Sequence, residues 1–506
     1  MKSEKCVLIL VLLLVTLTAA AQDVILRDCR PLLAGRRPAQ PLPRQTLVLP
    51  GAASAASGTA RQTGDVAQPT SIYVGERRQL VVLASFSDCT FQDADPLQLW
   101  NRIFNEPDFS EPPFYGSVHD YFYAQSYGRF SLTFDVIAID LGQPRSRYRS
   151  TSQDDENSQY LVSDIVDQLS EMSVDWGQYD WDGDGYVNQL LIIYAGKGQN
   201  AGGGSNTIWP HQWWLSEHSD PKTGAPLSPR TVTDDEGSQY TIDCYCAVQE
   251  LYSDGSYGSF GTICHEYSHC FGFPDFYNGA TSYVRQWDLM DYGCNNGGGF
   301  HPCGYSAHER MLMGWLTPVE LTEPTTVSAQ AALADAAEAY LVRNDGYAGE
   351  YYIVENRQPT GWDASLPASG VVVFHVDYDP AVWTDIDGRV NSQNRQRYLI
   401  VPANNRSSYF QSAGWPYPYQ DNNALTDDSQ PAATLWHDNS TGERLMSKPL
   451  TNIAVSGGVA SFDFMGGTTA ISTVRPTGVP PQTLYSLGPV DIVRYADGNV
   501  RKVVRP

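Results

Sequence analysis

Basic residues are scarce in this sequence. Its 506 residues include 33 Lys and Arg against 57 Asp and Glu, a formal net charge of -24 at pH 7. A protein that binds nucleic acid needs a basic face to contact phosphates, so nucleic acid is excluded as a partner. Charged residues of either sign make up only 18% of the chain, whereas Tyr (30) and Trp (12) are abundant. This composition is typical of a folded, secreted protein rich in extended sheet and not of a disordered one.

Long apolar runs are absent after the N-terminus, so no later segment is expected to span a membrane. The first residues, 1–5, are polar, residues 6–18 are apolar, and three alanines precede Gln22. This order predicts a signal peptide at 1–21 and a secreted or cell-surface protein with no membrane span after its removal. A retained N-terminal anchor is the alternative.

Cysteines are few and uneven in number. Of the nine, Cys6 lies in the signal and Cys29 in the following leader, which leaves seven. Seven is odd, so at least one thiol is expected to be free. Cys294 and Cys303 flank a Gly-rich loop and are predicted to be able to form a disulfide. Cys264 and Cys270 would lie on different faces of a helix and are not expected to pair.

The run at 264–275, CHEYSHCFGFPD, is the most informative stretch of the chain. His265 and His269 are four residues apart, so on a helix both imidazoles project from one face. Gly272 is expected to end the helix and turn the chain, which can bring Asp275 back towards the same point. Two imidazole nitrogens and one carboxylate oxygen, with a fourth position open, are typical of a catalytic zinc ion.

Two further residues support this interpretation. Glu266 follows the first histidine, where a carboxylate can accept a proton from a water molecule activated by the metal. Met290 lies in WDLMDYG at 287–293, and a methionine in a tight turn can supply an apolar floor for the ligand histidines.

The elements around the motif predict an α+β domain with a mixed sheet over residues 76–320. Strands are expected at 79–86, 130–136, 190–194 and 240–250, and helices at 117–128 and 158–169, before the helix that carries the histidines. The strand at 240–250 precedes this helix directly, so an extended peptide is expected to add alongside it by backbone hydrogen bonds.

An acidic loop at 180–188, DWDGDGYVN, resembles the first half of a calcium-binding loop. Asp180, Asp182 and Asp184 are the expected ligands, with the carbonyl of Tyr186. The loop is not an EF-hand, because its twelfth position would be Leu191. A solvated acidic turn is the alternative.

The remaining segments predict a leader, a second domain and a tail. Residues 22–75 are rich in Pro, Ala and Arg and are interpreted as a pro-segment. Residues 321–467 predict a β-rich, sandwich-like domain. There His375, Asp377 and Asp379 share one strand face, where packing is favoured over a metal site. Residues 468–506, with a linker at 473–481, resemble C-terminal sorting segments of bacterial type IX secretion; a structural hairpin is the alternative.

Several stretches resemble the immune inhibitor A-like secreted metallopeptidases, a metzincin-like zinc endopeptidase family. They are GSVHDYFYAQSYG at 116–128, YDWDGDGYVNQLLIIYAG at 179–196, IWPHQW at 208–213, CHEYSHCFGFPDFY at 264–277, WDLMDYG at 287–293 and LMGWL at 312–316. The resemblance implies a metzincin-like fold, zinc on His265 and His269, Glu266 as the catalytic base, and bound calcium. Asp275 is the third zinc ligand by the motif, and Glu309 on a later helix is the alternative.

The sequence therefore predicts a secreted zinc endopeptidase, made as a zymogen, that acts on proteins or peptides. Tyr292 or Tyr305 can stabilise the oxyanion, and nothing in the sequence decides between them. Two other functions stay open. One is a surface binding module with a vestigial zinc fold, and the other is a zinc amidase acting on cell-wall peptides.

Overall fold

The computed structural model describes most of the chain between residues 72 and 467. The described ranges are 72–149, 157–219, 227–258, 260–278, 281–383, 390–392, 394–407 and 409–467, with the backbone of three strands within 482–504. The predicted signal peptide, the leader up to residue 71 and the linker at 473–481 lie outside them. Within these ranges, no helix has both the length and the apolar character needed to cross a bilayer.

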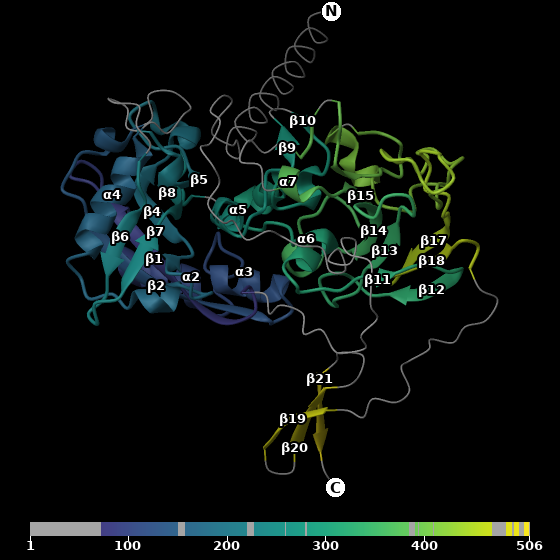
Figure 1. The fold of residues 1–506 in the computed structure, drawn as a ribbon, viewed down its shortest axis with the longest axis horizontal. Coiled ribbons are helices and arrows are strands. Elements are labelled where there is room, and N and C mark those ends of the chain that lie inside the picture. Colours follow the sequence, from purple (N-terminus) through teal and green to yellow (C-terminus); the bar gives the residue numbers. More distant parts are fainter. Residues whose placement is uncertain are drawn as a thin grey trace, which may run out of the picture.

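A five-stranded sheet with the order β2-β1-β4-β8-β5 organises the first part of the chain (Figure 1). Neighbouring strands are parallel except β5, which runs antiparallel to β8 at one edge. Val81 and Leu83 of β1 face one core, and Leu80 and Val82 face the other. Because both faces are buried, the apolar run of β1 is continuous. The strands are β1 (Gly75–Ser85), β2 (Phe130–Asp140), β4 (Leu190–Lys197), β5 (His211–Trp214) and β8 (Cys244–Leu251).

Helices cover both faces of this sheet. α4 (Ser158–Leu169) packs Leu161 and Ile165 into the core that contains Leu80. α2 (Pro96–Asn105), α3 (Val118–Gln125) and α5 (Phe260–Cys270) contribute to the opposite core. The predictions of α3, α4 and α5 are confirmed. The start of α3 was visible in the sequence because Ser117 and Asp120 form a capping box. α2 was not predicted.

The predicted strand at 240–250 is present but interrupted, and the expected peptide pairing along it is not met. The segment forms two strands, β7 (Gln239–Ile242) and β8, with a break at Asp243. β8 lies between β4 and β5, and its residues 245–247 are paired on both sides, so a peptide cannot add alongside them. β5 is the edge strand instead. β7 belongs to a small sheet with β3 (Tyr186–Val187) and β6 (Arg230–Thr233).

Two further sheets are built from residues 319–464. One has the order β11-β13-β14-β15-β16 and the other β12-β18-β17. Val373 of the first sheet and Phe462 of the second belong to the same hydrophobic core. The strands are β11 (Val319–Glu320), β12 (Thr325–Gln330), β13 (Tyr340–Arg343), β14 (Glu350–Arg357), β15 (Gly370–Asp377), β16 (Tyr398–Ile400), β17 (Leu450–Ser456) and β18 (Val459–Phe464).

The other face of the β14–β15 pair shares a core with the first part of the chain. Ile353 and Phe374 lie in the same hydrophobic cluster as Tyr267 of α5. α5 and α6 (Ala307–Leu312) lie between the two larger sheets (Figure 1). A continuous core therefore crosses residue 320.

The shorter elements complete the description. They are β9 (Tyr277–Asn278), β10 (Thr281–Ser282), α7 (Pro380–Trp383) and, near the C-terminus, the antiparallel strands β19 (Gln482–Leu487), β20 (Val490–Arg494) and β21 (Val500–Val504). The predicted disulfide between Cys294 and Cys303 is not formed in the structure. Cys264 and Cys270 do not pair with each other.

Candidate metal centre

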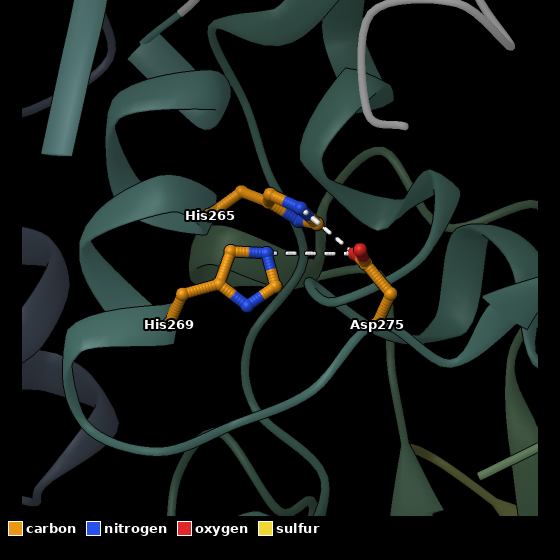
Figure 2. Close-up of side chains that lie close together, drawn as sticks. All are labelled: His265, His269 and Asp275. Carbon is orange, nitrogen blue, oxygen red and sulfur yellow. Dashed lines mark ion pairs between the residues drawn. The ribbon is translucent and has the colours of Figure 1, made fainter. Parts of the chain in front are cut away.

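α5 presents its two histidines from one face. His265 and His269 are one turn apart, with ring centroids separated by 4.8 Å. The helix ends at Cys270, and Gly272 adopts a φ of +94°, which reverses the chain without a steric penalty. The returning segment brings Asp275 opposite the histidines, and all three side chains point to a common centre (Figure 2).

The three candidate ligand atoms are close together and mostly buried. Each lies within 4.8 Å of the other two. Asp275 Oδ1 is 3.1 Å from His265 Nε2 and 3.5 Å from His269 Nε2. The side chains of His265 and Asp275 are 1% and 2% exposed, and that of His269 is 15% exposed. His269 is therefore the ligand candidate that faces solvent most.

Backbone carbonyls fix the tautomer of both histidines. His265 Nδ1 is 2.9 Å from Leu289 O, and His269 Nδ1 is 2.7 Å from Phe273 O. A carbonyl oxygen can only accept, so each Nδ1 carries the proton and each Nε2 of a neutral ring presents a lone pair. This is the usual support of a metal-binding histidine.

The donor set fits a divalent cation. Asp275 Oδ1 is buried and accepts no hydrogen bond, although it faces two imidazole nitrogens. Burial alone would raise the pKa of Asp275, but His269 and His265 hold it below its usual value, so the group is an ionised carboxylate. Two imidazole nitrogens and one carboxylate oxygen that converge in this way are a donor set that a zinc ion can bind.

The turn around Met290 lies against this centre. Met290 is fully buried, and its carbonyl accepts a hydrogen bond of 2.9 Å from the N–H of Phe276, the residue after Asp275. Asp288 Oδ1 accepts the N–H of Met290 at 2.9 Å, which stabilises the turn. Burial raises the pKa of Asp288 to about 7, against the opposing effect of the hydroxyl of Tyr398.

Glu266 lies next to the histidines, between α5 and the sheet edge. It is 5% exposed, and burial raises the pKa of its carboxyl, an effect opposed by the two histidines. The backbone N–H of Gln212, on edge strand β5, also hydrogen-bonds this carboxyl and lowers its pKa. A buried carboxylate with a raised pKa is suited to accept and return a proton.

Glu309, the alternative third ligand, is engaged elsewhere. Its Oε2 accepts the N–H of Ser306 at 2.7 Å and the Ser306 hydroxyl at 3.0 Å, in the capping box of α6. It is not in the group formed by His265, His269 and Asp275. Tyr305 is also engaged, because its buried hydroxyl hydrogen-bonds Ser268.

The acidic loop brings its three aspartates together. Carboxylate oxygens of Asp180, Asp182 and Asp184 all lie within 4.8 Å of one another. Asp180 accepts the N–H groups of Gly183 (2.8 Å), Asp184 (3.2 Å) and Gly185 (2.9 Å). Burial raises the pKa of Asp184, and the charges of Asp182 and Asp180 add to this. Tyr186 follows as the first residue of β3.

His375, Asp377 and Asp379, which the sequence places on one strand face, belong to a network of ion pairs. His375 Nε2 is 2.7 Å from Glu350, and Asp377 Oδ2 accepts Arg395 at 2.8 Å and Arg397 at 3.0 Å. Asp379 is 3.6 Å from Arg397. These charges are neutralised by each other, in line with the favoured interpretation that they have a packing role.

Sequence reasoning missed the residues that hold the ligands in place. These are the carbonyls of Phe273 and Leu289, the N–H of Gln212, and Gly261, where a Cβ would lie only 1.8 Å from Cys294 O. Of these, only Gly261 had a local signal, since a glycine inside a helix often marks a close contact.

His265, His269 and Asp275 form a group that could hold a metal ion, with Glu266 on the same helix. Metal-dependent hydrolases use ligands and a carboxylate of these kinds. Residues 101–314 match the family described as immune inhibitor A peptidase M6, catalytic domain. The predicted resemblance to this family is thereby confirmed over that stretch.

Curated relatives agree with this match. Immune inhibitor A from Bacillus thuringiensis subsp. alesti is 27% identical over 47% of this chain and 41% of its own length. Pre-pro-metalloprotease PrtV from Vibrio cholerae is 24% identical over 47% of this chain and 30% of its own length. The chain thus spans less than half the length of the curated relatives it matches.

A likeness to a solved structure is much weaker. Catalytically inactive OgpA from Akkermansia muciniphila, in complex with an O-glycopeptide substrate, matches with 10% identity and a TM-score of 0.21. The match covers 62% of this chain and 85% of that one.

Proposed function

We propose that the chain is a secreted zinc endopeptidase that hydrolyses peptide bonds of proteins. The observation that carries this proposal is the convergence of His265, His269 and Asp275 beside a buried Glu266. The family match over residues 101–314 and the metalloprotease named among the relatives support it.

The proposal includes the predicted layout of the chain. A signal peptide occupies 1–21, a pro-segment 22–75, a metzincin-like catalytic domain 76–320 and a sandwich-like domain 321–467. The segment 468–506 is the tail, for which a role in type IX sorting is part of the proposal. The core that the β11-β13-β14-β15-β16 sheet shares with the β12-β18-β17 sheet supports a sandwich-like packing.

In the proposed reaction, three residues bind the metal and Glu266 transfers a proton. When bound by His265, His269 and Asp275, zinc would polarise the scissile carbonyl and lower the pKa of a water molecule. Glu266 accepts the proton that this water loses as it adds to the carbonyl carbon. It then delivers the proton to the leaving amine nitrogen, so the carboxylate is regenerated at the end of the cycle. Leu289 and Phe273 keep both imidazoles in the required tautomer.

Edge strand β5 is the proposed place for the substrate backbone. It closes the sheet next to α5, and the N–H of Gln212 reaches the Glu266 carboxyl from this edge. An extended peptide that adds to a sheet edge is held by its backbone, which allows many side chains. A substrate chain on β5 would therefore pass beside the metal centre with broad sequence tolerance.

Tyr292 is the proposed group for the oxyanion. Tyr305 is fully buried against Ser268 and Trp315, so its hydroxyl does not reach a substrate. Tyr292 is partly exposed and comes two residues after Met290. A phenol at this position can donate a hydrogen bond to the developing negative charge.

We further propose that Asp180, Asp182, Asp184 and the carbonyl of Tyr186 bind calcium. The support is the cluster of carboxylate oxygens, two of whose side chains are exposed, on a loop that Asp180 already orders by three backbone hydrogen bonds. Oxygen ligands of this kind are those that calcium prefers.

The variant Glu266→Gln tests the proposed function. It removes the base and keeps the size of the side chain, so zinc should still bind in a 1:1 ratio while cleavage of casein falls by about 10²- to 10⁴-fold. Glu171→Gln makes the same chemical change at an exposed position and should leave cleavage unchanged. Metal analysis and a peptide-release assay give the two readouts.

The outcomes separate the alternatives. Casein cleavage that survives in Glu266→Gln removes Glu266 as the base. A wild-type protein that binds no zinc and cleaves nothing supports a binding module with a vestigial site. A wild-type protein that leaves casein intact and releases cell-wall peptides supports the amidase.

A further inference from the structure

Tyr398, on strand β16, contacts the turn at Met290 that lies against the candidate metal centre. Its side chain is fully buried. Its hydroxyl lies 2.8 Å from Asp288 Oδ2 and 2.7 Å from Ser306 Oγ. The phenol has one proton, and the carboxylate of Asp288 can only accept, so in the ionised state of Asp288 the hydroxyl of Tyr398 donates to it.

Asp288 connects this hydroxyl to a ligand histidine. Its other oxygen, Oδ1, accepts the N–H of Met290 at 2.9 Å. The peptide that it holds begins at Leu289, whose carbonyl accepts the Nδ1 proton of His265 at 2.9 Å. A short path of hydrogen bonds and one turn therefore links Tyr398 to His265, although Tyr398 comes 110 residues after Asp288.

The ring of Tyr398 supports the segment of the aspartate ligand. It packs on Phe276, the residue after Asp275, with ring centroids 4.1 Å apart. Asn391 strengthens this contact, because its Nδ2 donates to Phe276 O at 2.8 Å and its Oδ1 accepts the N–H of Tyr398 at 3.0 Å. Tyr398 thus contacts both the segment that carries Asp275 and the turn whose carbonyl orients His265.

We propose that Tyr398 is a positioning residue of the metal centre, which fixes Asp288 through its hydroxyl and thereby the carbonyl that orients His265. The proposal rests on the proposed function, because it assumes that His265, His269 and Asp275 bind zinc. Partners of this kind, which act on a ligand histidine from behind, typically contribute 10- to 100-fold to metal affinity. Tyr398 acts one step further from the metal, so we expect the lower end of this range.

The chain offers a matched control for a purely structural role. Tyr352 on β14 is also buried, and its hydroxyl donates to Thr434 O at 2.6 Å. It belongs to the core between the two sheets of the second part, on the side away from α5. Tyr352→Phe and Tyr398→Phe each delete one hydrogen-bonded hydroxyl and keep the ring.

The test measures zinc affinity of the full chain by competition with a chromogenic chelator. Tyr398→Phe should weaken zinc binding by about 10-fold, and Tyr352→Phe by less than 2-fold. Cobalt substituted for zinc gives a second readout, since a reoriented His265 changes the visible absorption of the Co²⁺ form. Only Tyr398→Phe should shift this spectrum.

A third variant shows whether the effect passes through Asp288. Asp288→Asn alone and together with Tyr398→Phe should weaken zinc binding to the same extent, because both changes interrupt one path. Fully additive losses overturn the proposal. So does zinc affinity of Tyr398→Phe within 2-fold of the wild type, or an equal loss in Tyr352→Phe. A wild-type chain that binds no zinc would instead refute the proposed function.

Discussion

His308 is fully buried, and no charged group among the described residues shifts its pKa. Four aromatic rings surround it, with centroids 5.4 to 6.0 Å away, from Tyr351, Tyr378, Trp383 and Tyr398. Its Nδ1 is 3.0 Å from the hydroxyl of Tyr351. Burial lowers the pKa of His308 to about 3, so the native protein keeps this ring neutral well below pH 6.

The protein should therefore lose stability in acid through His308. The unfolded chain binds a proton here below about pH 6.5, whereas the native state binds it only near pH 3. Stability from this residue is complete above pH 6.5 and falls as the pH decreases towards 3. Between pH 8 and pH 5 the loss is about 2 kcal/mol. Denaturant unfolding gives the free energy of unfolding of the wild type and of His308→Gln at pH 8 and at pH 5. The decrease between pH 8 and pH 5 should be larger in the wild type by about 2 kcal/mol.

Tyr351→Phe is the control for this measurement. It removes the same hydrogen bond without removing a titrating group, so its effect on the unfolding free energy should be equal at pH 5 and pH 8. An identical pH dependence in wild type and His308→Gln would contradict the prediction.

The acidic loop is the element whose stability should depend on a ligand. Three carboxylates within 4.8 Å repel one another, and a cation that binds among them removes this repulsion. Calcium at about 100 times its dissociation constant should stabilise the native state by about 2.7 kcal/mol, which raises the Tm of a unit of this size by about 3 °C. Asp182→Asn should lose most of this shift in a thermal scan.

Glu323→Gln is the matched charge change away from the loop, at another exposed position. It should keep the full response to calcium. A wild-type Tm that is the same with calcium and with a calcium-selective chelator would remove the calcium site from the proposal.

The residues of the candidate metal centre could be predicted from the sequence, because they lie within one short run. The backbone groups that orient the histidines could not be predicted. The spacing of His265 and His269, and the Gly272 that turns the chain, lie within one short run, so the convergence on Asp275 could be expected from the sequence. Leu289 comes 24 residues after His265 and acts through its backbone, which carries no side-chain signal.

The edge strand shows the same limit at the level of the sheet. The apolar run of β8 predicted a strand, but which side of a strand is free depends on pairings with β4 and β5, far away in the sequence. The sequence pattern correctly predicted the strand β8. It did not predict that β5 lies on the side where a peptide was expected.

At the scale of the whole molecule, the two parts of the chain share buried polar contacts as well as a core. Arg357 of β14 is fully buried and donates to the carbonyls of Trp287 (3.2 Å) and Gly304 (3.1 Å), on either side of the turn at Met290. Its charge is balanced by Asp363 at 2.7 Å. A buried arginine that loses these acceptors is strongly destabilising, so neither part is expected to unfold while the other remains native.

The described body should consequently unfold in one cooperative transition. Leu83 on β1 and Ile353 on β14 are both fully buried in the core that crosses residue 320. Leu83→Ala and Ile353→Ala should each destabilise the native state by about 2–5 kcal/mol. In calorimetry both variants should lower the same single Tm, because a loss of packing in either part lowers the stability of the common unit. Two transitions, of which each substitution moves only one, would show that the parts fold independently and that the shared core contributes little to their coupling.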